Sequence, residues 1–245
     1  MATLYDNRVD IFINNYTQLE TQLLECLDYM PFIVENKNVI SPKFIPIIVE
    51  SCALIESIFK QNINKDQKKY SFKKYSEFYE PILSLSGVFS IFLESPLQIL
   101  NPFNNWDTQQ PNWWEAYNLL KHDRLNNYKS ATITNALLAL SGLHQQMSKF
   151  KNFIGGFLKA GWIDTTDTDL IADISSVSHL AGLHPSPPSM IIESKLFVSP
   201  TRENFVTYIK KDDPCIFDID FDFRGLSNRV RTIIYAHQDW SNYYQ

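Results

Sequence analysis

The feature that most constrains this sequence is a change in the spacing of its apolar residues. From residue 4 to about residue 160, apolar side chains recur every three to four positions, the period of an α-helix that buries one face. Beyond a proline-rich segment at residues 184–188 the period becomes two, which is typical of β-strands. The sequence therefore predicts a mainly α fold: a helical bundle over residues 1–160 and a small C-terminal α/β or β-rich extension over residues 161–245.

Local signals set the expected boundaries of the helices and strands. Ser41-Pro42 is typical of an N-cap followed by the first helical residue. Pro81 is expected to kink or split the helical pattern around it, and Gly155-Gly156 to weaken helix continuation. The expected helices span residues 4–30, 41–60, 71–95, 113–125 and 130–150, with a loop at 96–112. The expected strands span residues 190–198, 205–209 and 215–223.

Composition excludes several classes of protein. The 245 residues carry 22 basic and 27 acidic side chains, a net charge of −5, and 14% of them are aromatic, so the chain is not of the disordered type. A negative total gives no general attraction to nucleic acid, so binding to RNA would need a local basic patch. The N-terminus is polar, and no run approaches the ~20 apolar residues that span a bilayer. We therefore expect a cytoplasmic protein that does not enter a membrane.

The three cysteines, Cys26, Cys52 and Cys215, are widely spaced and form no Cys-x-x-Cys pair. This spacing argues against a zinc site built on thiolates. Buried thiols in a reducing compartment are the expectation.

The most distinctive segment for chemistry is residues 113–124, which is predicted to be helical. Asn118 and His122 are four residues apart and share one helix face, and Lys121 and Arg124 adjoin that face. A histidine beside cations and an amide is able to act as a general acid or base on a phosphodiester, and the cations are able to hold a phosphate.

A structural interpretation of the same segment also stands. The histidine would then be satisfied inside the bundle, with Lys121 and Arg124 paired to Glu50, Glu56 or Asp123. Contacts with these carboxylates would indicate a structural role, whereas exposure in a groove would indicate a functional one. The nearby tryptophans likewise have two interpretations, a stacking surface for bases or packing between helices: Trp106, Trp113 and Trp114.

The pattern Trp-Trp-x-x-Tyr-Asn-x-x-Lys-His-x-Arg at residues 113–124 resembles helices of HEPN-type bacterial proteins. Residues 48–60 are similar to a core helix of that family, and residues 135–140 to the helix that follows the polar one. The resemblance covers about residues 4–155. It implies an up-and-down helical bundle, often dimeric, and many members are ribonucleases of toxin–antitoxin or antiphage systems.

The resemblance implies a metal-independent endoribonuclease without a cofactor. His122 would be the acid/base, Arg124 and Lys121 would hold the phosphate, and Asn118 would orient the site. RNA, an antitoxin or defence protein, and a second copy of the chain are the partners it implies. Active HEPN ribonucleases carry an Arg four to six residues before the His, whereas the nearest upstream arginine here is Arg8. The alternative is therefore a non-catalytic dimerisation or interaction protein.

An aspartate row and one further histidine are the remaining sequence features that bear on possible sites. Asp218, Asp220 and Asp222 would share one face of a strand, as a row that is able to hold Mg²⁺ or Ca²⁺, or simply as a solvated acidic face. His144 follows an apolar helical run and is expected at the surface or beside a helix C-terminus.

Overall fold

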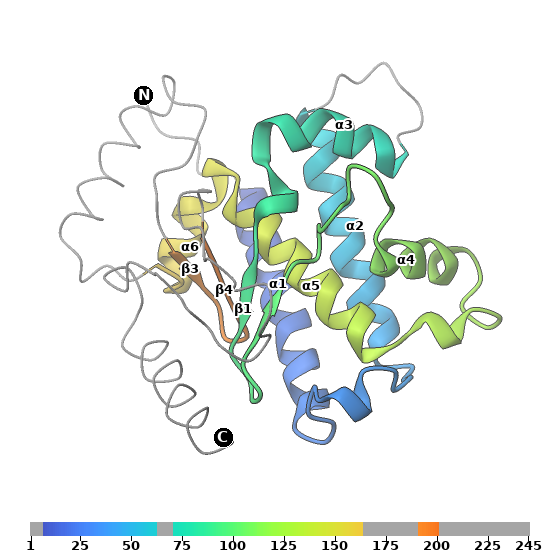
Figure 1. Cartoon of the computed structure of the whole chain (residues 1–245). Helices are drawn as coiled ribbons and strands as arrows, with labels where there is room; N and C mark the ends of the chain where they lie inside the picture. The colour runs from blue at the N-terminus through green and yellow to red at the C-terminus, as the bar shows by residue number, and fades with distance from the viewer. Residues whose placement is uncertain (1–6, 63–70, 164–190, 201–245) are drawn as a thin grey trace, which may run out of the picture.

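The computed structural model describes residues 7–62, 71–163 and 191–200, and these fold into six α-helices and one four-stranded sheet. The helices are α1 (Asn7–Leu27), α2 (Phe44–Asn62), α3 (Phe72–Leu83), α4 (Asn112–His122), α5 (Ile133–Ser148) and α6 (Ile154–Ala160). The strands are β1 (Ser90–Phe92), β2 (Gln98–Leu100), β3 (Ile191–Glu193) and β4 (Phe197–Pro200). The predicted fold class, mainly α with a small β element, is confirmed (Figure 1).

Helix α5 is the centre of the core. Every residue from Ala139 to Ser148 is buried, because α1, α2, α4 and β4 all pack against this helix. The Thr132 side chain caps its N-terminus by accepting a hydrogen bond from the backbone N–H of Asn135. A helix enclosed in this way needs apolar or small residues around its whole circumference, as the run from Ala136 to Leu143 provides.

Helix α1 shows the amphipathic pattern expected of the first helix. Tyr16 and Leu23 are completely buried, whereas neighbouring polar residues face solvent. Its first turns contact α6 closely: a Cβ at Gly156 would lie only 2.7 Å from Cγ1 of Val9. Gly156 therefore remains inside a helix, against its propensity, because the two helices approach too closely for a side chain.

The sheet joins two distant parts of the sequence. Its strand order is β2-β1-β4-β3, and all three pairings are antiparallel. Ile91 of β1 lies opposite Ile99 of β2 on one side and Val198 of β4 on the other. The described part of the extension thus completes a sheet that the bundle region begins, and the domain boundary at residue 160 stays a prediction.

Three sequence expectations about this sheet were wrong. The helix expected to reach residue 95 ends at Leu83, where Ser84 takes a left-handed conformation with φ of 47°. Residues 90–92 form β1, whose backbone pairs with β4 on one side and with β2 on the other. Residues 98–100, expected within a loop, form β2 and pair with β1. The single strand expected at 190–198 is a hairpin, β3 and β4. The other two expected strands lie outside the described residues.

The aromatic residues build the core between α2, α3 and α4. Trp106 and Trp113 are 1% exposed and Trp114 is 4% exposed, so the interpretation as core packing is confirmed. Trp106 stacks on Phe59, with 5.7 Å between ring centroids, and its indole N–H bonds to Glu80. The indole N–H of Trp113 donates to the carbonyl of Pro102 at 2.7 Å. Both polar atoms therefore have partners despite burial.

Two other expectations concern the thiols and the membrane. Cys26 and Cys52 are buried free thiols, as expected, and Cys215 lies outside the described residues. No helix in the described ranges combines the length and the apolar character that crossing a bilayer requires.

Candidate functional site

Helix α4 carries most of the predicted site because one of its faces is anchored in the core. Trp113, Trp114, Tyr117 and Leu120 recur at helical spacing and are all buried. The helix begins after Pro111 and ends at His122, three residues earlier than expected. The exposed end of α4 is therefore held rigidly by the buried face behind it.

The structure separates the four candidate residues into a helical set and a loop residue. Asn118 and His122 are one turn apart near the end of α4, as predicted, and Lys121 precedes His122. Arg124 lies beyond Asp123, which caps the helix, so the expectation that it adjoins the same helix face was wrong. The helix ends here because the side chain and the carbonyl of Asp123 accept hydrogen bonds from Asn126 and Asn127 in the loop that follows.

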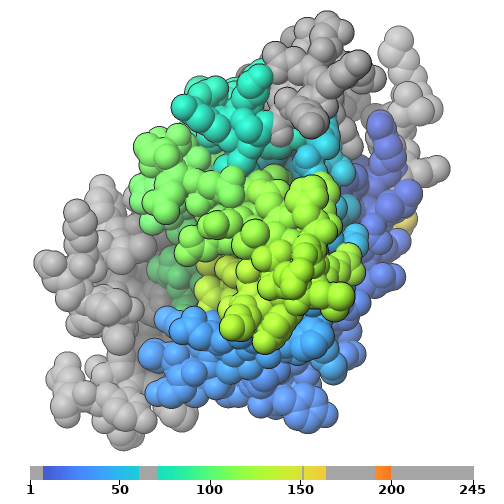
Figure 2. Space-filling view, turned by 90° about the vertical axis from the view of Figure 1, so that its right-hand side faces the viewer, coloured from blue at the N-terminus to red at the C-terminus, as the bar shows by residue number. Residues whose placement is uncertain are grey.

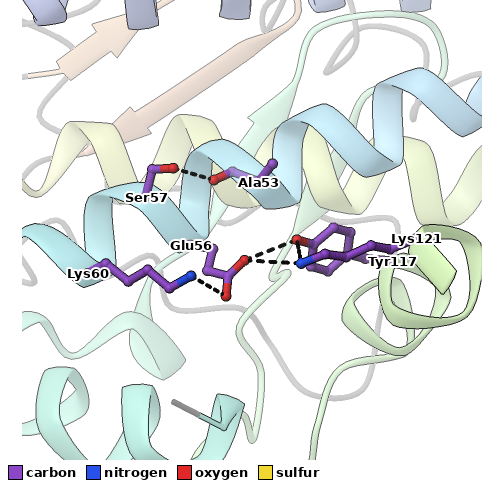
Figure 3. Close-up of polar contacts among 6 residues, drawn as sticks. All are labelled: Ala53, Glu56, Ser57, Lys60, Tyr117 and Lys121. Atoms are coloured by element: carbon purple, nitrogen blue, oxygen red, sulfur yellow. Dashed lines mark hydrogen bonds and ion pairs between the residues drawn. The ribbon is translucent and has the colours of Figure 1, made fainter. Parts of the chain in front are cut away.

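Lys121 is engaged with the core through Glu56 of α2. Its Nζ donates to the hydroxyl of Tyr117 at 2.8 Å and lies 3.6 Å from Oε2 of Glu56. The Tyr117 hydroxyl donates to the same Oε2 at 3.1 Å, and Lys60 Nζ lies 2.8 Å from Oε1 (Figure 3). The structural interpretation, in which Lys121 pairs with Glu56, is therefore confirmed for this one residue.

The charges of this cluster explain its titration. Burial alone would raise the pKa of Glu56, but the hydrogen bond from Lys60, the charge of Lys121 and the bond from Tyr117 hold it below its usual value. Burial, together with the Glu56 carboxylate, raises the pKa of Tyr117 above its usual range. Glu56 is thus ionised near neutral pH and compensates the charge of Lys121, which joins α4 to α2.

His122 and Arg124 are arranged differently. Both side chains are exposed, and within the described residues neither makes a hydrogen bond or an ion pair. Large apolar side chains surround them in the sequence: Leu119 is 39% exposed, Leu125 87% and Tyr128 48%. The face drawn in Figure 2 shows this part of the chain, at the yellow-green end of α4 and the following loop, projecting toward the viewer.

The loop after α4 is organised by its own hydrogen bonds. Oδ1 of Asp123 accepts from the backbone N–H of Asn126 at 3.1 Å, and the Asn127 side chain donates to the carbonyl of Asp123 at 2.8 Å. The Asn126 side chain also donates to Oδ2 of Asp123, and this bond, followed by the one from the Asn126 backbone, lowers the pKa of the Asp123 carboxyl. Arg124 and Leu125 are therefore presented outward from a loop of fixed shape, which reduces the entropy lost when such a loop binds a ligand.

A buried polar cluster between α1, α5 and the β3–β4 hairpin was missed from the sequence. Glu20 is 1% exposed and accepts hydrogen bonds from Tyr16, Ser194 and the backbone N–H of Leu196. His144 is completely buried, so its predicted surface position was wrong; α5 is enclosed by β4 and α1 at this point. One signal was available: Glu20 falls on the apolar stripe of α1, four residues after Tyr16.

No ligand set for a metal is formed by the part of the chain that the structure describes. Within it, no three His, Cys, Asp or Glu side chains are placed to hold an ion together. Asp218, Asp220 and Asp222 lie outside the described residues.

The structure thus has two places that could carry a function. One is the exposed end of α4 with the loop after it, which carries Arg124 and Leu125, and the other is the buried polar cluster of Glu20 and His144. Comparison of the chain with protein-family models, with curated proteins and with solved structures gave no match.

Proposed function

We propose that the end of α4 and the loop that follows it form an RNA-binding surface of a HEPN-like protein of a bacterial defence or toxin–antitoxin system, acting as a metal-independent endoribonuclease. The observation that carries the proposal is the exposure of His122 and Arg124 without partners among the described residues. A general acid/base and a phosphate ligand must both be free to meet the substrate.

Local charge favours an anionic partner at this surface. Residues 118–130 carry Lys121, Arg124 and Lys129 against Asp123, a local balance of 3 − 1 = +2 in a chain of net charge −5. Part of the Lys121 charge is compensated by Glu56. Arg124 is thus the better placed of the two proposed phosphate ligands.

In the proposed reaction His122 removes the proton from a ribose 2′-hydroxyl, and the resulting oxygen attacks the adjacent phosphate. The P–O5′ bond breaks, leaving a 2′,3′-cyclic phosphate, and the departing 5′-oxygen takes the proton from His122 to become a 5′-hydroxyl. Arg124 offsets the charge that develops on the phosphate, and Asn118 orients the histidine ring. A symmetric dimer that brings two α4 ends together would supply a second copy of each group.

The test is cleavage of labelled single-stranded RNA by the purified full chain in EDTA. The proposal predicts cleavage that is reduced at least 100-fold in His122→Ala. The matched control is Gln22→Ala, an exposed substitution on α1 that should leave cleavage unchanged. An inactive wild type, or a His122→Ala variant as active as the wild type, would refute the catalytic proposal.

A second candidate function is a non-catalytic interaction surface for another copy of the chain, an antitoxin or a defence protein. The exposed apolar side chains Leu119, Leu125 and Tyr128 favour it, because large apolar residues exposed together at a helix end and in the following loop are typical of protein interfaces. Sedimentation velocity of the wild type and of Leu125→Ser tests this for self-association. A dimer that Leu125→Ser weakens would support it, and a wild-type monomer would refute the homodimer.

A further inference from the structure

The β3–β4 hairpin is attached to the bundle through two buried serines as well as through apolar packing. Ser194, in the turn, and Ser199, in β4, are 3% and 0% exposed and both point at polar groups of the helices. Backbone bonds complete the attachment: Leu93 donates to the carbonyl of Leu196, and Glu193 donates to that of Trp162, each at 2.8 Å. The hairpin is thus docked by specific polar contacts in addition to the burial of its apolar side chains.

At the turn, the docking contact is a carboxylate. Ser194 Oγ donates to Oε1 of Glu20 at 2.5 Å, and the backbone N–H of Leu196 donates to the same oxygen at 2.9 Å. Tyr16 also donates to this oxygen, at 3.1 Å. One oxygen of a buried α1 side chain therefore accepts both donors of the turn.

In β4, the docking contact is a histidine ring. Nδ1 of His144 lies 2.8 Å from Oγ of Ser199, and this hydroxyl lies 2.6 Å from that of Ser90 in β1. Rings of Tyr16, Trp162 and Phe197 pack around the imidazole at centroid distances of 5.6–5.9 Å. Nε2 has no hydrogen-bond partner among the described residues.

This environment suits only a neutral imidazole. In a neutral ring, the Nδ1–H is able to donate to Ser199 Oγ while Nε2 stays an acceptor without a hydrogen. A protonated ring would bury a charge and would also leave the Nε2–H without an acceptor. The ionisable groups of this network in the described residues are Tyr16, whose ring packs on the imidazole, and Glu20, which accepts from Tyr16. The hairpin itself carries Glu193 and Lys195. Burial correspondingly lowers the pKa of His144 to about 3.

We propose that residues 191–200 are a proton-controlled, detachable part of the fold, docked while His144 is neutral and released when it is protonated. Release would leave the edge of β1 without its partner and would open the enclosed face of α5 around His144. Protonation would therefore uncover the β1 edge and the α5 face that the docked hairpin covers.

Hydrogen exchange of the full chain, followed by mass spectrometry from pH 7.5 to pH 5 and corrected for intrinsic exchange rates, tests the proposal. Below pH 6.5 the opening constant of amides in β4 should rise by up to tenfold per pH unit, while that of α2 amides changes less. His144→Gln keeps a group able to bond to Ser199 but does not titrate, so it should abolish the rise. The matched control His122→Gln changes an exposed histidine and should retain it.

Two results would overturn the proposal: the same pH dependence in His144→Gln as in the wild type, or β4 and α2 amides opening together at every pH. If His144→Gln does not fold, titration of the wild-type imidazoles by NMR decides the question, with His144 assigned by elimination from substitutions of the other four histidines. His144 should stay neutral at pH 5 while the hairpin remains protected. An ordinary titration near pH 6.5 with the hairpin still docked would refute the mechanism.

Discussion

The two histidines within the described residues lie in opposite environments. His122 ends α4, is exposed and has no partner among the described residues, whereas His144 is enclosed by α1, β4 and the aromatic core. Exposure keeps the first ring available to a ligand and makes it almost irrelevant to stability. Enclosure gives the second ring a large effect on stability and no access to substrate. The difference shows that the histidine left free to meet a ligand is the one that takes no part in the packing of the core.

The largest effect expected from this comparison is the dependence of stability on pH. The folded pKa of His144 is about 3, against an ordinary value of 6.5, so the unfolded chain binds a proton that the folded chain does not between these pH values. The free energy of unfolding should fall as the pH drops below 6.5, by about 1.4 kcal/mol per pH unit from this residue. Urea unfolding at pH 7.5, 6 and 5 measures it.

Glu56 also stabilises the folded protein, because its pKa is lower in the folded state than in the unfolded chain. This stabilisation is lost only as the pH falls below the usual pKa of 4.5, so it adds to the loss from His144 at lower pH. The His144→Gln variant should lose less stability than the wild type between pH 6.5 and 5, and His122→Gln should follow the wild type. Parallel curves for all three proteins would mean that the buried histidine does not set the acid sensitivity.

A second large effect is expected for Glu20→Ala. It removes the acceptor of Tyr16, of Ser194 and of the Leu196 N–H, and the loss should lower the free energy of unfolding by about 3 kcal/mol. Chemical denaturation at pH 7.5 measures this. Glu25→Ala, an exposed substitution on the same helix, is the control and should change stability by less than about 0.5 kcal/mol. A similar small change in both variants would contradict the importance of the buried carboxylate.

An intermediate effect is expected at the junction of α2 and α4. Glu56→Gln keeps the shape of the side chain but removes the charge that Lys60 and Lys121 compensate, so it should cost about 1 kcal/mol at neutral pH. Thermal unfolding with and without added salt measures it. Glu77→Gln, whose partner Lys73 is 3.9 Å away at the surface, is the control with a near-zero effect. A loss that persists in 1 M salt would show that packing, not charge, joins the helices.

The smallest stability effect is expected at the proposed RNA surface. His122→Ala and Arg124→Ala should each change the free energy of unfolding by less than about 0.5 kcal/mol, because neither side chain has a partner in the described structure. RNA binding by Arg124→Ala should nevertheless weaken, as measured by fluorescence anisotropy at low salt. A large loss of stability in either variant would place these residues in the structural group with His144.

Much of the fold followed from local patterns. The apolar stripe of α1, the helix before residue 60 and the apolar run of α5 were predicted close to their observed positions, since each pattern reports a buried helix face directly. Ser90–Phe92 was predicted as helix because a short apolar run is compatible with either state until its partner is known. That partner, β4, lies more than 100 residues later, and no local signal indicates such pairing.

The candidate site shows the same division. The sequence by itself determined that Asn118 and His122 share a face and that Lys121 lies beside them, because helical geometry fixes the positions of neighbours along one helix. Only the tertiary structure decided that Lys121 pairs with Glu56 and that His144 is buried rather than exposed. Burial and ion pairing depend on what the other helices and strands place opposite a side chain, and that arrangement is a property of the whole packed core rather than of any one segment.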